Sequence, residues 1–453
     1  MHVITTDLTS AETFSSAGVV PRATALDTAR TGLDVFLPTL AKGVIVRRRA
    51  ILRLAEWLQF DRRAIRRMQD LRARYGTGPL LLSIPGRSVA LIFDPAHVHR
   101  ILAETPQPFT PASKEKIAAL SHFEPQGVLL SKGSERADRR RYNEEVLEPH
   151  APLHHLSDTF AQVVDSEIAQ LHSVRSGGVL SWQAFSQAWF RIVRRVIFGD
   201  AAREDKELIR IMFELRKAGN WPFLAPRRTR KRERLHERIL EYLRRAEPKS
   251  LAGAMAHIPA GPETAPEQQV PQWLFAFDAA GMATFRTLAL LATHREYAKE
   301  VRRALGGAGE KRYLKAAVLE SVRLWPTTPL LLRESTAATE WEGGVLPADT
   351  AIVIFTPFFH RDNERLPYAD RFAPELWQNG EPPQNAAFVP FSEGAAACPG
   401  RELVLMLSSA LISSLLSHAR LRLLPGSALK PGQPIPATLS HFHLRFELRR
   451  LRP

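Results

Sequence analysis

Cysteine is almost absent from this chain, which has a single one, Cys398, among 453 residues. One thiol forms no intrachain disulfide and no metal cage built from cysteine alone, so both frameworks are excluded. The chain also lacks a nucleotide-binding glycine loop, because Gly306-Gly-Ala-Gly309 has the wrong order and follows no predicted strand. We therefore expect no flavin or nicotinamide domain within the chain.

Long hydrophobic runs are missing as well. The apolar stretch 33–46 contains Asp34, Pro38 and Lys42 and is too short to span a bilayer. Residues 1–30 are polar and lack the basic and then apolar layout of a signal peptide. We expect a flexible segment over 1–30, one domain over 31–453, and a cytoplasmic protein.

The segment 47–74 is basic and has the apolar spacing of amphipathic helices. We expect these helices to pack on the domain, with peripheral contact to a membrane surface as the alternative.

Acidic residues are in deficit, with 47 Asp and Glu against 62 Lys and Arg and a formal net charge of +15. Such a balance suits an acidic partner or a nucleic acid. The cations lie in helical runs such as 136–141 and 227–234 rather than in a tail or reader motif, so we expect no nucleic-acid partner. A helical nucleic-acid-binding protein without catalysis remains the alternative from another class.

Cys398 lies between two glycines, Gly394 and Gly400, and just before a helical apolar pattern over 404–416. A thiol at a helix N-terminus meets unpaired N–H groups and the positive end of the helix dipole. We expect this environment to lower the pKa of the thiol and to suit it as a metal ligand.

The segment 391–400 resembles the haem-binding loop of the cytochrome P-450 superfamily, Phe-x-x-Gly-x-Arg-x-Cys-x-Gly. Phe391, Gly394, Cys398 and Gly400 match, whereas Ala396 stands where the family has a basic residue. The resemblance implies a mainly α-helical fold with small β-sheets, of the soluble bacterial type. It also implies haem b held by the Cys398 thiolate as axial ligand to iron.

Two further segments follow in the family's order. Glu320 and Arg323 resemble its Glu-x-x-Arg pair, and Arg333 ends the next strand-like run, where the family's arginine contacts a haem propionate. Leu376 replaces the arginine that completes the family's charged triad. His360, Arg361 or Arg371 would then substitute for it, or the pair stands alone. The stretch 341–354 predicts a hairpin.

Upstream, Ala280, Gly281 and Thr284 resemble the family's oxygen-binding helix motif, in a helical pattern predicted over 272–305. The acid that relays protons in the family is Ala283 here. A packing patch of small residues is the competing interpretation. Where such a helix passes close to haem, a mid-helix hydroxyl that bonds to a backbone carbonyl can open a polar notch in the helix.

Arg136 and Arg140 occupy the place of the family's propionate-binding helix residues. Arg136, Arg139 and Arg141 are also predicted to dock an electron donor, a ferredoxin or flavodoxin with its reductase. The aromatic segment 221–226 is expected to be a lid over the substrate entrance or a solvated loop.

The resemblance implies insertion of one oxygen atom from O2 into a small apolar organic substrate. The substrate is expected against Phe275, Phe277, Ala280, 330–332 and 439–443. Two alternatives stay open, namely a peroxide-using or rearranging haem-thiolate enzyme and a haem binder without catalysis.

Overall fold

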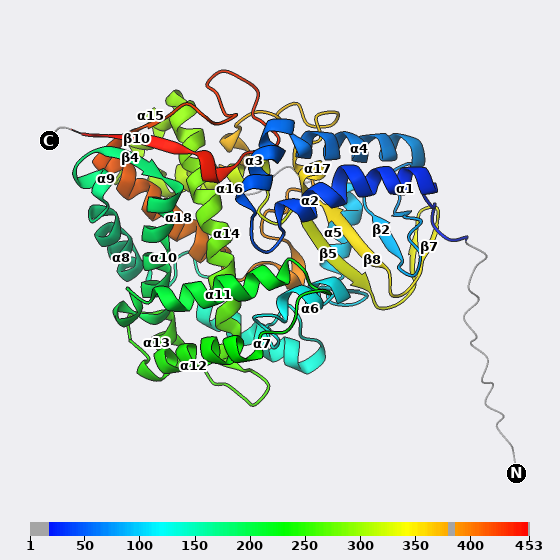
Figure 1. Ribbon diagram of the computed structural model, residues 1–453, viewed down its shortest axis with the longest axis horizontal. Coiled ribbons are helices and arrows are strands. Elements are labelled where there is room, and N and C mark those ends of the chain that lie inside the picture. The colour runs from blue at the N-terminus through cyan, green and yellow to red at the C-terminus, as the bar shows by residue number, and fades with distance from the viewer. Residues whose placement is uncertain (1–17, 379–385, 452–453) are drawn as a thin grey trace, which may run out of the picture.

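The computed structural model describes residues 18–378 and 386–451 of the chain. These residues form one mainly helical body with small β-sheets, a five-stranded sheet on one side and a three-stranded sheet on the other (Figure 1), which confirms the predicted fold class. Apolar side chains form one large core among the helices and a second core around the five-stranded sheet.

The N-terminal helices lie beside the five-stranded sheet, and all but the last of them precede its first strands. They are α1 (Ala25–Thr31), a π-helical turn (Gly32–Phe36), α2 (Leu37–Lys42), α3 (Arg49–Leu58), α4 (Phe60–Tyr75) and α5 (Pro95–Ala103). Helix α5 starts where the Asp94 carboxylate accepts the N–H of Ala96 and proline occupies the first turn.

The five-stranded sheet has the order β1-β2-β8-β5-β3, and only β2 and β8 are parallel. Its strands are β1 (Leu80–Leu81), β2 (Val89–Leu91), β3 (Phe109–Thr110), β5 (Leu330–Ser335) and β8 (Ala351–Phe355). A second sheet joins β4 (Gly178–Ser181), β10 (Arg445–Arg450) and β9 (Ala419–Leu423), and β6 (Thr339–Trp341) pairs with β7 (Gly344–Leu346).

The remaining helices build the larger part of the body. They are α6 (Lys114–Leu120), α7 (Gly133–Leu147), α8 (Ser157–Ala169), α9 (His172–Arg175), α10 (Trp182–Phe198), α11 (Lys206–Gly219), α12 (Thr229–Arg245), α13 (Leu251–Met255), α14 (Pro266–Thr293), α15 (Arg295–Ala304), α16 (Ala308–Leu324), α17 (Thr356–Arg361) and α18 (Arg401–His418). Short 3-10 turns lie at Asp200–Ala202, Pro374–Trp377, Gly394–Ala396 and His441–His443.

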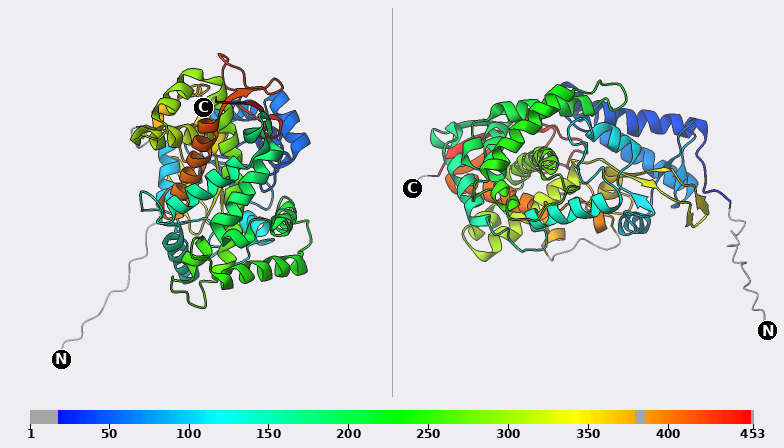
Figure 2. Two further views of the ribbon diagram at one scale, coloured as in Figure 1. Left: turned by 90° about the vertical axis from the view of Figure 1, so that its left-hand side faces the viewer. Right: turned by 90° about the horizontal axis from the view of Figure 1, so that it is seen from below.

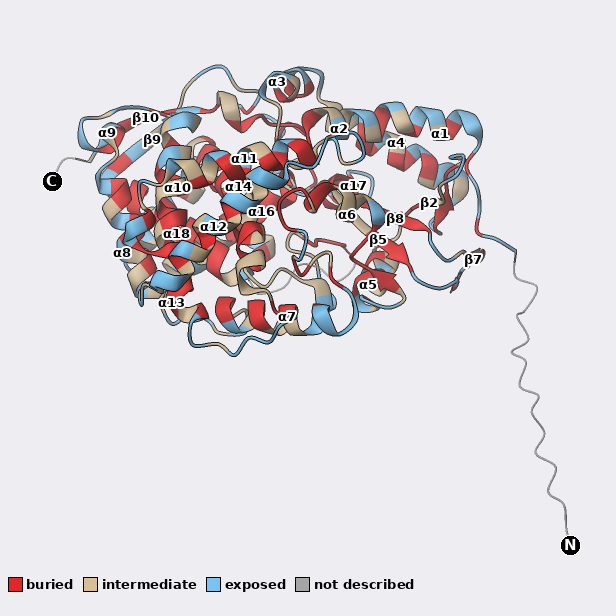
Figure 3. Cartoon of the chain, turned by 60° about the horizontal axis from the view of Figure 1, so that its bottom comes forward, coloured by how far each residue is buried: buried red, intermediate tan, exposed pale blue. Residues whose placement is uncertain are grey.

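Helix α14 runs through the middle of the helical part and packs against α10, α16 and α18 (Figure 2). Among the described residues it is the one helix long and apolar enough to cross a membrane, but 78% of its most apolar window is buried in the protein. It is therefore the core helix of the fold, and Figure 3 shows how much of its surroundings is buried.

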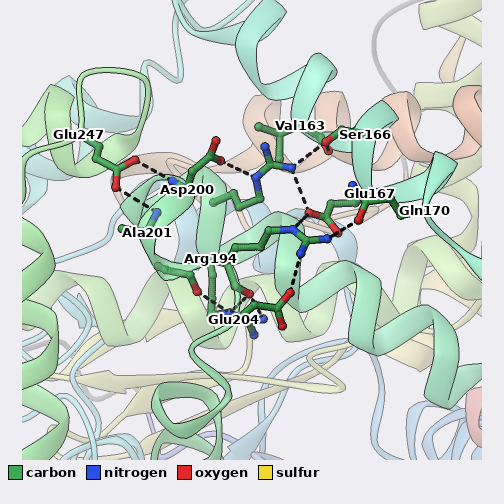
Figure 4. Close-up of polar contacts among 12 residues, drawn as sticks. Val163, Ser166, Glu167, Gln170, Arg194, Asp200, Ala201, Glu204 and Glu247 are labelled. Carbon is green, nitrogen blue, oxygen red and sulfur yellow. Dashed lines mark hydrogen bonds and ion pairs between the residues drawn. The ribbon is translucent and has the colours of Figure 1, made fainter.

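A buried carboxylate ties α8 to α10 and to the turn that follows it (Figure 4). Glu167 is fully buried and accepts hydrogen bonds from Arg195 and Arg203 at 2.6–3.0 Å. Glu247 accepts the N–H groups of Asp200 and Ala201 at 2.7 and 3.1 Å. These carboxylates fix the end of α10 against its neighbours.

Three predicted boundaries are corrected. Residues 18–30 were expected to be flexible, but 18–23 bridge to β1 and β7 and α1 begins at Ala25. The helix predicted over 272–305 is two helices, α14 and α15, separated at His294, where no glycine or proline marks the break. In the stretch 341–354, only the β6–β7 pair is a hairpin, because β8 joins the five-stranded sheet.

Candidate active site

The loop before α18 places Cys398 at the start of that helix. The Cys398 N–H donates to the Phe391 carbonyl at 2.8 Å, which closes the loop around a 3-10 turn at Gly394–Ala396. Both Phe391 and Cys398 are half-buried. Cys398 is the one free thiol of the chain, and α18 begins three residues later.

The pKa of the Cys398 thiol is raised, because burial outweighs the opposing effects of the Gly400 N–H, Arg140 and Arg401. The predicted lowering of this pKa is therefore wrong for the protein by itself. The electropositive groups are in place, but the thiolate needs a bound metal to become the stable form.

The two glycines of the loop have different roles. Gly394 has φ +65°, and a Cβ atom there would lie 2.2 Å from the Leu102 carbonyl oxygen, so the position requires glycine. Its close neighbour is thus the backbone at the end of α5. A Cβ at Gly400 would meet only the Leu147 side chain at 3.9 Å, an ordinary contact.

Arg136 and Arg140 of α7 both reach the cysteine loop. Arg136 is buried and donates to the carbonyls of Val128 and Ala395, each at 3.1 Å. Arg140 donates to the Ala397 carbonyl at 2.5 Å and pairs with Glu144 at 2.6 Å. Helix α7 therefore lies alongside the segment that carries the thiol.

Arg333 approaches the same loop from β5. Its guanidinium donates to Thr105 Oγ1 at 3.0 Å and to Ser392 Oγ at 3.2 Å, and only 2% of the residue is exposed. Burial, and secondarily the charge of Arg136, lowers its pKa to about 10. The two arginines thus repel each other within a desolvated space.

Lys116 is a further buried cation near Arg136 and Arg333, and it was not predicted from the sequence. Its Nζ lies 3.4 Å from the Leu332 carbonyl, and burial followed by the charges of Arg333 and Arg136 lowers its pKa well below the ordinary value. A lysine in a short helix of mixed polarity gives no sequence signal for this role.

These cations provide a test of whether haem fits the site. Arg136, Arg333 and Lys116 have no carboxylate partner within 4.0 Å in the part of the chain that the structure describes. Buried charges of one sign are costly unless they are compensated. Two propionate groups would supply the missing negative charge beside the Cys398 loop, so the residues present fit haem.

Glu320 and Arg323 of α16 form a fully buried ion pair at 2.6 Å. Trp377 Nε1 and the Ala373 N–H donate to Glu320 at 2.9 and 2.8 Å, while Arg323 also donates to the His360 and Arg371 carbonyls. Of the two alternatives for the third partner, no His360, Arg361 or Arg371 side chain joins the pair among the described residues, so the ion pair stands without a third charged group. The Trp377 indole, next to Leu376, fills that place.

On α14, Thr284 Oγ1 lies 2.8 Å from both the Ala280 carbonyl and Ser408 Oγ of α18. The predicted bond from the mid-helix hydroxyl to a carbonyl is present. However, Thr284 is fully buried, and its hydroxyl is also engaged with the neighbouring helix. Its catalytic role stays a prediction.

Gly281 was predicted to lie at the oxygen-binding face, and the structure gives it a packing role instead. A Cβ at this position would lie 2.7 Å from Trp189 Cδ1 of α10. The Trp189 indole N–H donates to the Phe277 carbonyl at 2.7 Å. Glycine is needed here because an indole ring lies flush against the helix.

One face of α14 is less buried than the rest of the helix. Gln272, Phe275, Ala276 and Ala279 are half-buried and recur at helical spacing. The consecutive leucines 330–332 of β5 are half-buried as well. Phe277 and His441, also expected to line the substrate space, are buried instead against Trp189 and Trp182. The small residues Ala276 and Ala279 were missed because alanines in a helix carry no signal of their own.

The predicted electron-donor surface also needs correction. Arg136 and Arg139 are only 6% and 5% exposed, so they form no docking surface. Arg141 is partly exposed but paired with Asp138 and Glu145. Arg401, which directly follows the cysteine loop, is an exposed cation.

Comparison with known proteins agrees with this geometry. The family model described as Cytochrome P450 matches residues 276–441. Cyclooctat-9-en-7-ol 5-monooxygenase of Streptomyces melanosporofaciens is 30% identical over 33% of this chain and 37% of its own length. A cytochrome P450 monooxygenase of Fusarium pseudograminearum is 38% identical over 25% of this chain and 21% of its own length. The chain therefore matches well under two thirds of these relatives.

Solved structures match over far more of the chain. Cyanobacterial CYP120A1 with retinoic acid bound has a TM-score of 0.70 at 18% identity, covering 96% of this chain and all of that chain. A six-coordinated cytochrome P450 from Thermus thermophilus has a TM-score of 0.64 at 19% identity, covering 85% of this chain and 98% of that one. At sequence identities of 18% and 19%, the structural similarity establishes the fold.

The predicted resemblance to the cytochrome P450 superfamily is therefore confirmed, since its family model matches residues 276–441 and the solved structures share the fold over most of the chain. The predicted cofactor, haem b with a cysteine thiolate as axial ligand, is confirmed at the level of the family, and Cys398 is the cysteine that this chain offers.

Proposed function

We propose that the protein is a haem-thiolate monooxygenase that inserts one oxygen atom from O2 into a mainly apolar organic molecule. The observation that carries this proposal is the half-buried Cys398 at the start of α18, beside buried cations that lack carboxylate partners. The monooxygenase names of the relatives support it. We further propose a cytoplasmic protein with at most peripheral membrane contact.

The residues of the chain have separable tasks in this reaction. Haem bound at this site would supply the activation of dioxygen. Cys398 would hold its metal as a thiolate, while Arg136 and Arg333 would bind the propionates. The half-buried face of α14 and the leucines 330–332 exclude water and orient the substrate. The electrons come from a separate ferredoxin or flavodoxin with its reductase, which an exposed cation such as Arg401 would help to dock.

A second candidate is favoured by one specific observation. Ala283 offers no acid, and the Thr284 hydroxyl is bonded within the protein to Ala280 and Ser408. A positioned acid or base typically contributes about 10²–10⁴-fold to a rate, so its absence is costly where protons must reach dioxygen. A peroxide-using enzyme has no such need, since peroxide brings its own protons and electrons.

The spectrum of the reduced protein under carbon monoxide tests the common part of both candidates. Thiolate-bound haem gives a characteristically red-shifted Soret band, and Cys398→Ala should abolish it because no other cysteine replaces the ligand. An unchanged red-shifted band in Cys398→Ala would rule out the assignment.

The coupling of NAD(P)H consumption to product formation then distinguishes the O2-dependent monooxygenase from the peroxide-using enzyme. We expect poor yield of product per NAD(P)H consumed with a ferredoxin and its reductase, and comparatively good turnover with peroxide. Ala283→Asp should raise the yield if proton delivery limits the wild type. Tight coupling in the wild type that Ala283→Asp fails to improve would contradict the proton-delivery argument.

A further inference from the structure

An open cavity of about 520 Å³ lies where α3 meets α4 and the loop that follows β9. Three cations line it, namely Arg53 of α3, Arg62 of α4 and Lys430 of the loop. Trp57 of α3 also lines the cavity and is 78% exposed. Tryptophan is highly buried on average, so an indole ring so far exposed calls for an explanation. The cavity is separate from the site around Cys398.

The positive charge of this cavity is largely uncompensated. Neither Arg53 nor Lys430 pairs with a carboxylate within 4.0 Å in the part of the chain that the structure describes. Arg62 lies 3.2 Å from a carboxylate oxygen of Asp370, but the same carboxylate also pairs with the buried Arg361. The cations at the cavity are therefore available to an anion from outside the chain.

Glu56 is the one acidic residue that lines the cavity, and it does not cancel these charges. It is 7% exposed and thus lies deeper than the cations, and its Oε1 accepts the Ala428 N–H at 3.1 Å. This hydrogen bond holds the loop after β9 against α3. Even with Glu56 counted as an ionised carboxylate, one negative charge stands against three cations. The rim of the cavity therefore suits an anionic group.

The exposed face of α3 beside the cavity is apolar as well as basic. Arg49, Arg53 and Trp57 recur every four residues and so share one face of the helix. Leu54 and Leu58 form the neighbouring row and are 44% and 48% exposed. Exposed apolar side chains gathered in this way mark an interaction surface.

The occupant has to satisfy the cations and the apolar side chains together. A free phosphate ester would pair with the cations but would leave Trp57, Leu54 and Leu58 in water. An anionic phospholipid supplies a phosphate for the cations and an apolar phase for the leucines. An indole ring is also well suited to the boundary between head groups and hydrocarbon, because its body is apolar and its N–H is polar.

We propose that the exposed face of α3 docks the protein onto an anionic lipid surface, with the phosphate of one phospholipid bound in the cavity by Arg53, Arg62 and Lys430. Trp57 and the two leucines enter the boundary beside it. The inference goes beyond the proposed function, because it assigns a face and a lipid class to the membrane contact and uses no residue of the haem site. Docking would bring the enzyme to the phase in which a mainly apolar substrate dissolves.

Vesicles of two compositions test this proposal on the haem-loaded, full-length protein. One set contains phosphatidylcholine alone, and in the other set phosphatidylglycerol replaces part of it. Each cation at an anionic surface contributes about fivefold, so we expect at least about tenfold tighter binding to the anionic vesicles in a co-sedimentation assay. Equal binding to both vesicle types would overturn the proposal. Binding of soluble glycerol phosphate without binding of vesicles would assign the cavity to a soluble ester and overturn it too.

Paired substitutions distinguish the cavity from the general positive charge of the chain. Arg53→Gln/Lys430→Gln removes the two cations without carboxylate partners and should weaken binding to the anionic vesicles about ten- to thirtyfold. Arg244→Gln/Lys249→Gln removes the same charge at exposed positions at and just after the end of α12, on the opposite side of the molecule from α3 (Figure 1), and should leave binding unchanged. Equal loss in both double variants would mean non-specific attraction and contradict the proposal.

Trp57→Ser tests the apolar part of the surface. Loss of the indole should weaken binding to the anionic vesicles about tenfold, because less apolar area leaves water on docking. Leu153→Ser, at a residue that is 39% exposed in the loop after α7, is the control and should bind as the wild type does. Wild-type affinity in Trp57→Ser would show that the indole does not enter the lipid and would refute the docking mode.

The substituted side chains are exposed, so the variants are expected to retain the fold, and the spectrum under carbon monoxide checks this for each of them. The same spectrum separates the two proposals. If thiolate haem is present and the anionic vesicles do not bind, this inference alone fails. If the vesicles bind as expected and thiolate haem is absent, the proposed function alone fails.

Discussion

Buried cations without carboxylate partners are the feature of single residues that most directly bears on the cofactor. Arg136 and Arg333 are 6% and 2% exposed, and burial lowers the pKa of each guanidinium. In a family that binds a dianionic macrocycle, this unfavourable arrangement of like charges has a physical reason. We propose that the propionates of the bound cofactor compensate these charges.

Arg333→Gln separates this role from ordinary packing. Charge-assisted hydrogen bonds contribute about 1.5–3 kcal/mol, so haem should dissociate about tenfold faster or more. The haem-free variant should be at least as stable as the wild type, because one of two mutually repelling buried cations is gone.

Haem transfer to an excess of apomyoglobin measures the first quantity, and denaturant unfolding of the haem-free protein measures the second. Arg365→Gln, at an exposed position, is the control and should change neither. Unchanged haem loss in Arg333→Gln would show that the propionates bind elsewhere.

At the scale of elements, helices in this fold are joined by buried carboxylates as well as by apolar packing. Glu320 holds α16 to the 3-10 turn at Pro374–Trp377 through the Trp377 indole and the Ala373 N–H. Glu167 holds α8 to the end of α10. Each carboxylate satisfies donors that would otherwise be buried without acceptors.

Glu167→Gln should therefore lower the free energy of unfolding by about 1–3 kcal/mol, because Arg195 and Arg203 lose their shared charged acceptor. Urea unfolding followed by circular dichroism measures this. Glu296→Gln removes a carboxylate whose side chain is 84% exposed and should change stability by less than about 0.5 kcal/mol. Equal effects of the two substitutions would mean that the buried network does not hold the helices together.

For the whole molecule, buried neutral histidines make stability depend on pH. Burial lowers the pKa of His360 to about 3, and that of His441 is also well below its ordinary value. The unfolded chain binds a proton at each site below about pH 6.5, whereas the folded chain does not. Stability is therefore full above that pH and falls as the pH decreases toward the folded pKa.

The expected slope is up to about 1.4 kcal/mol per pH unit for each histidine. Unfolding in urea at several pH values between 7 and 5 should show this loss in the wild type and a shallower loss in His360→Gln. His150→Gln, at an exposed position, should follow the wild type. Identical slopes in all three proteins would show that His360 does not remain neutral in the folded state.

The sequence by itself determined the parts of the site that depend on short spacings along the chain. Cys398 with its glycines and the pair Glu320 and Arg323 lie within one loop or one helical turn, and Arg333 lies ten residues further on in the next strand. Local backbone geometry fixes such arrangements, so the resemblance of these short motifs to the family's motifs was sufficient to predict them.

Only the tertiary structure decided which distant side chains complete them. Thr284 contacts Ser408 across 124 residues, Trp377 reaches Glu320 across 57, and Trp189 occupies the space beside Gly281. Lys116 acquires its significance from burial beside Arg333 and Arg136, which no local pattern records. Packing of helices brings these groups together, and it is packing that makes a charge or a hydroxyl available to a ligand or commits it to the protein.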